Sequence, residues 1–177
     1  MEKVLIYTNH YGSRSLSGYE LSKFASWGCK KIRETKDEGI PVLIFRGLSG
    51  STMATAINVR YNSMHQQDMG MVYVRKPEES SHSKSNLMTS WPEDKTPSEA
   101  LIGNFTYRYY FVDDFIDRGN TFIQCMQTFR ATYPNLVIPK VTLLVENSLG
   151  ALIEDNKFSF KVDGYSYGDK DLPVKDF

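Results

Sequence analysis

The chain has 177 residues, 21 of them basic and 21 acidic, so its formal net charge is zero. This length suits one domain with a sizeable core, and 41% apolar residues with 13% aromatics are typical of a globular rather than a disordered protein. Without net charge no global field attracts nucleic acid or an anionic membrane. Any anion site must therefore be local, and we expect no nucleic-acid partner.

The two cysteines and the first residues indicate where the protein resides. Cys29 and Cys125 have neither metal-ligand spacing nor a CxxC pattern, which favours a reduced, intracellular protein. The apolar run in MEKVLIYTNHYG is too short for a signal peptide, and no segment approaches the length of a membrane span. We therefore expect a cytoplasmic protein with no membrane partner.

The first third of the chain alternates apolar runs with polar turns. Val4–Tyr7 is a short predicted strand, and a Gly/Ser-rich loop follows at His10–Gly18. Tyr19–Glu38 has apolar residues at helical spacing and is predicted to end at Gly39. Pro41–Phe45 is a continuous apolar run, which is typical of a strand buried on both faces.

The middle of the chain repeats this alternation and then becomes polar. Arg46–Thr52 is a predicted loop, Met53–Tyr61 a helix and Gly70–Val74 a strand. The following stretch, Arg75–Thr96, has little to bury and is predicted to be a long loop. Another strand is expected within Leu101–Tyr107.

The last part of the chain contains a second strand–loop–helix unit. Tyr109–Val112 is a predicted strand, Phe122–Tyr133 a helix and Lys140–Val145 a buried strand. Apolar strands that alternate with helices predict an α/β fold with a mostly parallel central sheet flanked by helices. Ligands of such sheets bind beyond the carboxyl ends of the strands. We therefore expect three loops to converge at one edge, namely Arg46–Thr52, Arg75–Lys84 and Asp113–Thr121.

The most informative segment is YYFVDDFIDRGNTF, which starts at Tyr109. Its apolar run ends in two carboxylates, Asp113 and Asp114, and a short polar turn then leads into a helix. A strand, a turn and a helix N-terminus can hold a phosphate, because the first helical N–H groups lack partners. The carboxylates would repel a phosphate, so we expect them to face sugar hydroxyls or a divalent cation. The segment therefore predicts sites for both ends of a sugar phosphate.

This pattern resembles the phosphoribosyl pyrophosphate (PRPP) motif of type I phosphoribosyltransferases. The family form has four apolar, two acidic, two apolar and one variable residue before Thr-Gly-x-Thr/Ser, and the chain departs from it only at Arg118. The segment Arg46–Gly50 is similar to the Arg-Gly loop of adenine phosphoribosyltransferases, and Val74–Pro77 to the start of the catalytic loop of the adenine and orotate enzymes. The resemblance implies one domain over residues 1–177, with a small hood from about 1–30 and 150–177.

The resemblance also implies a role for each matched residue. The ribose hydroxyls would bind Asp113 and Asp114, directly or through Mg²⁺. The 5′-phosphate would bind Asp117, Arg118, Gly119, Asn120 and Thr121, and the pyrophosphate would bind Arg46, Gly47, Leu48 and Ser49. Arg75 and Lys76 would act from a mobile lid, and Asp117 would serve as the catalytic acid or base.

The implied activity is transfer of ribose 5-phosphate from PRPP to a nucleobase, with release of pyrophosphate and Mg²⁺ as cofactor. Asp117 favours a 6-oxopurine, whereas Arg46-Gly47 and Val74–Pro77 favour adenine or orotate. The identity of the acceptor base therefore stays undecided. A purine, and hence a role in purine salvage, is slightly favoured. Stacking on the base is a further expectation for Tyr165, Tyr167 and Phe177. The resemblance also allows a homodimer.

Two other interpretations stay open. The family's basic and glycine residues after Pro77 are replaced here by Glu78, Glu79, Ser80 and Ser81. Arg118 could bind phosphate with its guanidinium, or it could pair with the acidic residues and plug the site. The chain could then be a degenerate member that acts as a nucleotide sensor, regulator or partner-binding module. A nucleotide hydrolase or phosphatase that uses Asp113 or Asp114 is disfavoured, because the chain has no Gly-Lys-Ser/Thr phosphate loop.

Overall fold

A computed structural model describes most of the chain, namely residues 4–6, 17–35, 39–77, 79, 85–92, 106–116, 118–136, 141–148, 159–162 and 165–168. The helices are α1 (Gly18–Glu34), α2 (Gly47–His65) and α4 (Asn120–Thr132). The strands are β1 (Val4–Ile6), β2 (Ile40–Phe45), β3 (Gly70–Val74), β4 (Leu87–Ser90), β5 (Tyr107–Ile116), β6 (Val141–Ser148), β7 (Ser159–Val162) and β8 (Tyr165–Gly168).

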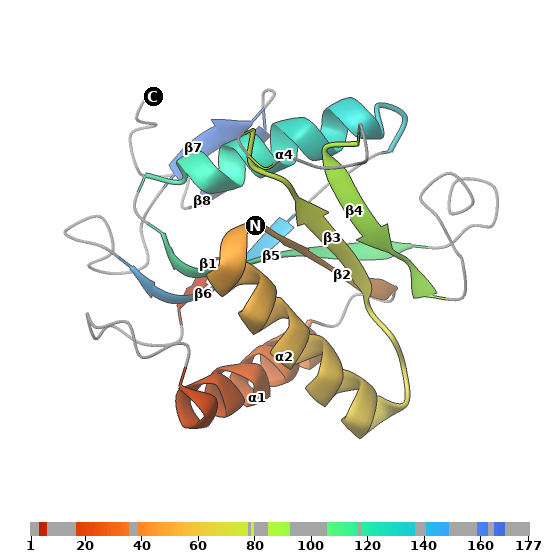
Figure 1. Cartoon of the computed structure of the whole chain (residues 1–177), viewed down its shortest axis with the longest axis vertical. Coiled ribbons are helices and arrows are strands. Elements are labelled where there is room, and N and C mark those ends of the chain that lie inside the picture. Colours follow the sequence, from red (N-terminus) through yellow and green to blue (C-terminus); the bar gives the residue numbers. More distant parts are fainter. Residues whose placement is uncertain are drawn as a thin grey trace.

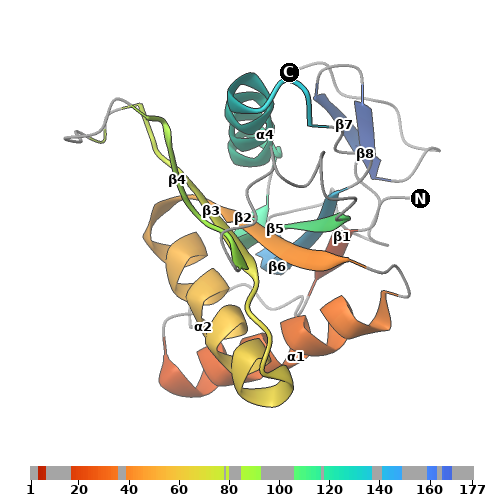
Figure 2. The same cartoon turned by 90° about the vertical axis from the view of Figure 1, so that its right-hand side faces the viewer.

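Six strands form the central sheet in the order β1-β6-β5-β2-β3-β4. All neighbours are parallel except β3 and β4, which are antiparallel. Helices α1 and α2 cover one face of the sheet, and α4 covers the other (Figures 1 and 2). This arrangement confirms the expected α/β fold with a mostly parallel sheet. The antiparallel β7–β8 pair lies beside α4 (Figure 2).

The centre of the sheet is a point where the chain changes direction. From β2 the chain crosses through α2 to β3 on one side, and from β5 it crosses through α4 to β6 on the other side. The two helices lie on opposite faces, so a crevice opens where the carboxyl ends of β2 and β5 meet. Ligands of open α/β sheets bind at such switch points.

The apolar run of β2 is explained by burial on both faces. Val42 and Ile44 pack in the cluster that contains α4, whereas Leu43 and Phe45 pack in the cluster that contains α1 and α2. Because successive side chains of a strand point to opposite faces, a strand covered by helices on both sides needs apolar residues at every position.

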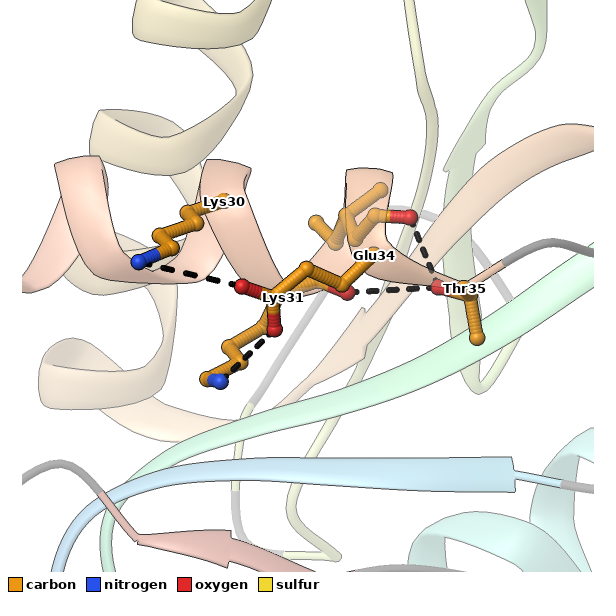
Figure 3. A network of polar contacts seen from close by, with 5 residues as sticks. Lys30, Lys31, Glu34 and Thr35 are labelled. Atoms are coloured by element: carbon orange, nitrogen blue, oxygen red, sulfur yellow. Dashed lines mark hydrogen bonds and ion pairs between the residues drawn. The ribbon is translucent and has the colours of Figure 1, made fainter.

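Helix α1 ends four residues before the predicted end at Glu38. The Thr35 hydroxyl donates to the carbonyl oxygens of Lys31 and Ile32, at 3.2 and 2.6 Å, which closes the last turn. Figure 3 shows this end, where Lys30 and Lys31 also approach the Glu34 carboxylate at 3.8 and 2.7 Å. Arg108 of β5 donates to the Ile32 carbonyl oxygen at 3.0 Å. Thr35 and Arg108 therefore supply donors to the Lys31 and Ile32 carbonyl oxygens, two of the terminal acceptors that the helix leaves without backbone partners.

Two boundaries near the expected loops differ from the prediction. Helix α2 begins at Gly47, so most of the predicted Arg46–Thr52 loop is helical; the hydroxyls of Ser51 and Thr52 bond the carbonyls of Gly47 and Leu48. Strand β5 continues to Ile116, because pairing with β6 extends from Asp113 opposite Val145 to Ile116 opposite Ser148. The carboxylate pair therefore lies within the strand rather than after it.

The long polar stretch contains an additional strand that was not expected. β4 pairs antiparallel with β3 and buries Leu87, while Met88 on the same strand is 54% exposed. A single buried residue in four gives little periodic signal, so the strand was missed. Of the predicted strand Leu101–Tyr107, residues 101–105 lie outside the described residues and Tyr107 begins β5.

The described helices include none with the length and apolar character needed to cross a bilayer. The expected hood falls mostly outside the described residues, as does Phe177. Within it, α1 packs against α2 and the sheet, and only the backbone of β7 and β8, which carries Tyr165 and Tyr167, is described.

Candidate functional site

A pocket of about 660 Å³ lies at the carboxyl ends of β2, β3 and β5. It brings together segments that are far apart in the sequence. Its lining consists of Arg46, Gly47, Leu48, Ser49, Lys76, Pro77, Phe111, Asp113, Phe115, Ile116, Arg118, Gly119, Asn120, Thr121, Phe122 and Gln124. Residues from all three of the expected loop segments therefore share one cavity.

Two helix N-termini open into this pocket. Gly47 at the start of α2 has a φ of +69°, which lets the chain turn from strand to helix without an intervening loop. Gly119 precedes α4 with a φ of +77°. Neither helix has a side-chain hydrogen bond at its N-cap. The first N–H groups of both helices are therefore available to an anion, and both helix dipoles present their positive ends.

The charged side chains of the lining are mostly basic. Arg46, Lys76 and Arg118 contribute three positive charges, and Asp113 is the single carboxylate among the lining residues that the structure describes. The whole chain has zero net charge, so the positive charge here is a local concentration. A pocket of this kind attracts a polyanion.

Asp113 is half-buried near the first turn of α2. A Cβ placed on Gly50 would lie 3.8 Å from the Asp113 Oδ1 atom and 3.2 Å from the Val112 carbonyl oxygen, so α2 approaches β5 closely there. Burial, followed by the adjacent Asp114 carboxyl, raises the pKa of Asp113 to about 8, and the hydrogen bond from the Asp114 backbone N–H and then the Lys76 charge oppose the shift. Asp113 therefore keeps its proton to a higher pH than an ordinary aspartate, and a cation beside it would compete with that proton.

Asp114 has a different position. Its backbone N–H donates to Asp113 Oδ1 at 3.0 Å, and its own Oδ1 accepts from the Phe115 N–H at 3.0 Å. Asp114 is not among the residues that line the pocket. The two predicted ribose ligands are therefore neighbours, but only Asp113 faces the cavity.

Lys76 is positioned by a turn that the sequence interpretation missed. The Glu79 N–H donates to the Lys76 carbonyl oxygen at 3.0 Å, which closes a turn with Pro77 at its second position. The Glu79 carboxylate accepts from the Tyr73 hydroxyl at 2.7 Å and from the Lys76 N–H at 3.3 Å. The Lys76 side chain passes near Gly47, where an added Cβ would lie 3.7 Å from its Cε atom. Pro77 after a strand was the available signal for this turn.

The other predicted lid cation, Arg75, does not line the pocket. Its Nη1 atom is buried and has no hydrogen-bond partner among the described residues, and its backbone N–H donates to the Asn86 carbonyl oxygen at 3.0 Å. The predicted acid or base, Asp117, lies outside the described residues, as do residues 80–84 of the expected loop.

Arg46 and Arg118 differ in how they are bound. The Arg46 side chain is buried. Its guanidinium donates to the last residue of β3, to Arg75 directly after it, and to Gln124 of α4, which the sequence interpretation missed. Arg118 is exposed at the pocket. Within the part of the chain that the structure describes, it makes no ion pair with Asp113 or Asp114. A plug formed by either of these two pairs is therefore not seen.

No family model and no curated protein sequence matches the chain. Among solved structures, the chain is similar to a hypoxanthine-guanine-xanthine phosphoribosyltransferase, with 13% identity, 81% of this chain and 70% of the other covered, and a TM-score of 0.45. It is also similar to an orotate phosphoribosyltransferase from Francisella tularensis, at 14% identity, 75% and 68% coverage and a TM-score of 0.39. A hypothetical protein from Neisseria gonorrhoeae with bound ppGpp matches at 13% identity, 88% and 80% coverage and a TM-score of 0.42.

Proposed function

We propose that the protein is a magnesium-dependent phosphoribosyltransferase that uses PRPP. One observation carries the proposal: two uncapped helix N-termini and a half-buried aspartate share a single pocket. A ligand that matches this arrangement has two separate anionic groups joined by a part that bears hydroxyls. PRPP is such a molecule, with a phosphate and a pyrophosphate on one ribose.

The ligand groups are assigned to the two helices as follows. The 5′-phosphate binds the N-terminus of α4 at Gly119, Asn120 and Thr121, and Arg118 supplies a positive charge. The pyrophosphate binds the N-terminus of α2 at Gly47, Leu48 and Ser49, with Lys76 above it. The ribose hydroxyls lie at Asp113 between the two anion sites.

The residues present suit a magnesium ion that arrives with the ligand. The described residues contain no group of three or more His, Cys, Asp or Glu that could hold a metal alone. Mg²⁺ commonly uses one or two carboxylates together with waters and substrate phosphate oxygens, so Asp113 with PRPP oxygens is a sufficient set. When bound, the ion neutralises charge on the pyrophosphate. Asp114 supports Asp113 through its backbone N–H.

The reaction breaks the bond between the ribose C1′ atom and the pyrophosphate oxygen, and the electron pair leaves with pyrophosphate. Lys76 and the first N–H groups of α2 stabilise the negative charge that develops there. A ring nitrogen of the acceptor base forms the new bond to C1′ and loses its proton. Asp117 is proposed to take that proton, and a purine is the favoured acceptor.

A second candidate is a PRPP- or nucleotide-binding protein without catalytic activity. The position of Arg75 favours it, because only one of the two expected lid cations lines the pocket. Such a protein would bind PRPP with magnesium through the same helix N-termini and release no pyrophosphate.

A base panel separates the candidates. The purified protein is incubated with PRPP, Mg²⁺ and each purine or pyrimidine base, and pyrophosphate release is measured alongside PRPP binding by calorimetry. We expect release with at least one base. Binding without release across the whole panel would select the second candidate, and absence of PRPP binding would contradict the first candidate.

A further inference from the structure

The Arg46 side chain joins three elements at the wall of the pocket. Its Nη1 atom donates to Gln124 Oε1 at 2.7 Å, its Nη2 atom to the Arg75 carbonyl oxygen at 2.9 Å, and its Nε atom to the Val74 carbonyl oxygen at 3.3 Å. The residue is only 7% exposed. Its backbone is the N-cap position of α2. One side chain therefore connects the start of α2, the end of β3 and the first turns of α4.

These hydrogen bonds use the geometry of a guanidinium. The rigid fork presents its donors in fixed directions, whereas a lysine ammonium could not reach acceptors on two separate elements in the same way. In the described part of the chain, Arg46 has no carboxylate within ion-pair distance. Its acceptors are two backbone carbonyls and a neutral amide. The hydrogen bonds therefore hold the three elements in position rather than neutralise a negative charge.

The elements that Arg46 joins are those that carry the proposed anion sites. Gln124 lies one turn after Asn120 and Thr121 on α4, and Arg75 precedes Lys76 at the end of β3. Arg46 itself precedes Gly47 and Leu48 on α2. This set of hydrogen bonds therefore links the two helix N-termini to each other.

We infer that Arg46 and Gln124 form a clamp that fixes the spacing between the two anion sites. Arg46 is thus a positioning residue rather than a pyrophosphate ligand, and Gln124 is its hydrogen-bond partner on α4. The inference rests on the proposed function, since the spacing matters for a ligand that must reach both sites at once. A ligand with two linked anions gains affinity from preorganised sites, whereas a ligand with one anionic end needs only one of them.

The test compares three ligands on matched variants. Gln124→Leu removes the acceptor for Arg46, and Gln127→Leu makes the same change at an exposed position on the same helix that does not line the pocket. Arg46→Lys keeps the positive charge but removes the planar guanidinium that reaches both acceptor elements. Calorimetry with Mg²⁺ measures the affinity for PRPP, ribose 5-phosphate and pyrophosphate, and thermal melts establish that each variant is folded.

The expected pattern is selective for the ligand that spans both sites. Loss of a hydrogen bond to a charged group should lower PRPP affinity about tenfold or more in Gln124→Leu and Arg46→Lys, relative to Gln127→Leu. Affinity for ribose 5-phosphate and for pyrophosphate should change by less than about threefold. Equal losses for pyrophosphate and PRPP would overturn the inference, because they would make Arg46 a ligand. Equal PRPP affinities in Gln124→Leu and Gln127→Leu would also overturn it.

Hydrogen exchange separates failure of the clamp from failure of the proposed function. If the parent protein binds no PRPP, the proposed function fails while the clamp can still be measured. Gln124→Leu should then speed amide exchange both at Arg75, whose N–H donates to the Asn86 carbonyl oxygen just after β3, and at Ile123, whose N–H donates to the Gly119 carbonyl oxygen at the start of α4, unlike Gln127→Leu. Unchanged exchange at either place would overturn the clamp.

Discussion

Asp113 has a carboxyl group whose burial disfavours its charge in the folded protein. Its pKa rises from an ordinary value near 3.8 to about 8, so between these pH values the folded chain binds more protons than the unfolded chain. The stability that this group contributes is therefore present at low pH and is lost as the pH rises toward 8. A ligand that brings a cation to Asp113 would release the proton.

Asp113→Asn should therefore stabilise the protein at high pH while it abolishes PRPP-dependent turnover. The amide keeps the shape of the carboxyl group and removes the cost of a half-buried charge. We expect thermal melts of the variant and the parent to differ most near pH 9 and to converge near pH 4. A difference that is the same at both pH values would show that the charge of Asp113 is not the cause.

Arg118 is expected to bind the ligand rather than block it. Its side chain is exposed at the pocket and makes no ion pair with Asp113 or Asp114 among the described residues. Arg118→Thr should weaken PRPP binding about tenfold, by loss of a charge-assisted hydrogen bond, and the loss should shrink at high salt. Arg33→Thr, an exposed change on α1, is the control for a general charge effect. Raised activity in Arg118→Thr would identify a plug instead.

At the scale of elements, the turn from β2 into α2 depends on one glycine. Gly47 has a φ of +69°, a conformation that alanine adopts only with strain. Gly47→Ala should cost about 1 kcal/mol or more in stability and displace the N-terminus of α2, which lowers pyrophosphate affinity. Gly18→Ala is a matched control, because Gly18 also begins a helix and an added Cβ there meets no atom within 4 Å. Equal stability and affinity in the two variants would contradict the assignment.

The boundaries of elements were less predictable than their existence. The apolar runs predicted β2, β3 and β6 well, because strands buried on both faces have a continuous apolar pattern. The polarity of the acidic pair predicts a loop from Asp113 onward, yet backbone pairing with β6 extends the strand through Asp113. Side-chain polarity does not report such pairing. The hydrogen bond between Tyr73 and Glu79 could not be predicted either, because no sequence pattern links these two residues.

At the scale of the whole molecule, the convergence of three segments followed from chain order. Parallel strands direct their carboxyl ends to one edge, so Arg46, Lys76 and Asp113 meet although they are distant in sequence. The sequence could not predict which of the neighbouring side chains face the cavity. Asp114 and Arg75 do not line it, and Gln124 does. That outcome depends on strand register and on hydrogen bonds that form only in the folded chain.

The central claim is that one pocket holds both ends of a single activated sugar phosphate. Competition calorimetry in the presence of Mg²⁺ tests this claim most directly. We predict that one PRPP binds per chain, that binding needs Mg²⁺, and that ribose 5-phosphate and pyrophosphate each displace it. PRPP binding that neither fragment displaces, or no PRPP binding at all, would contradict the claim.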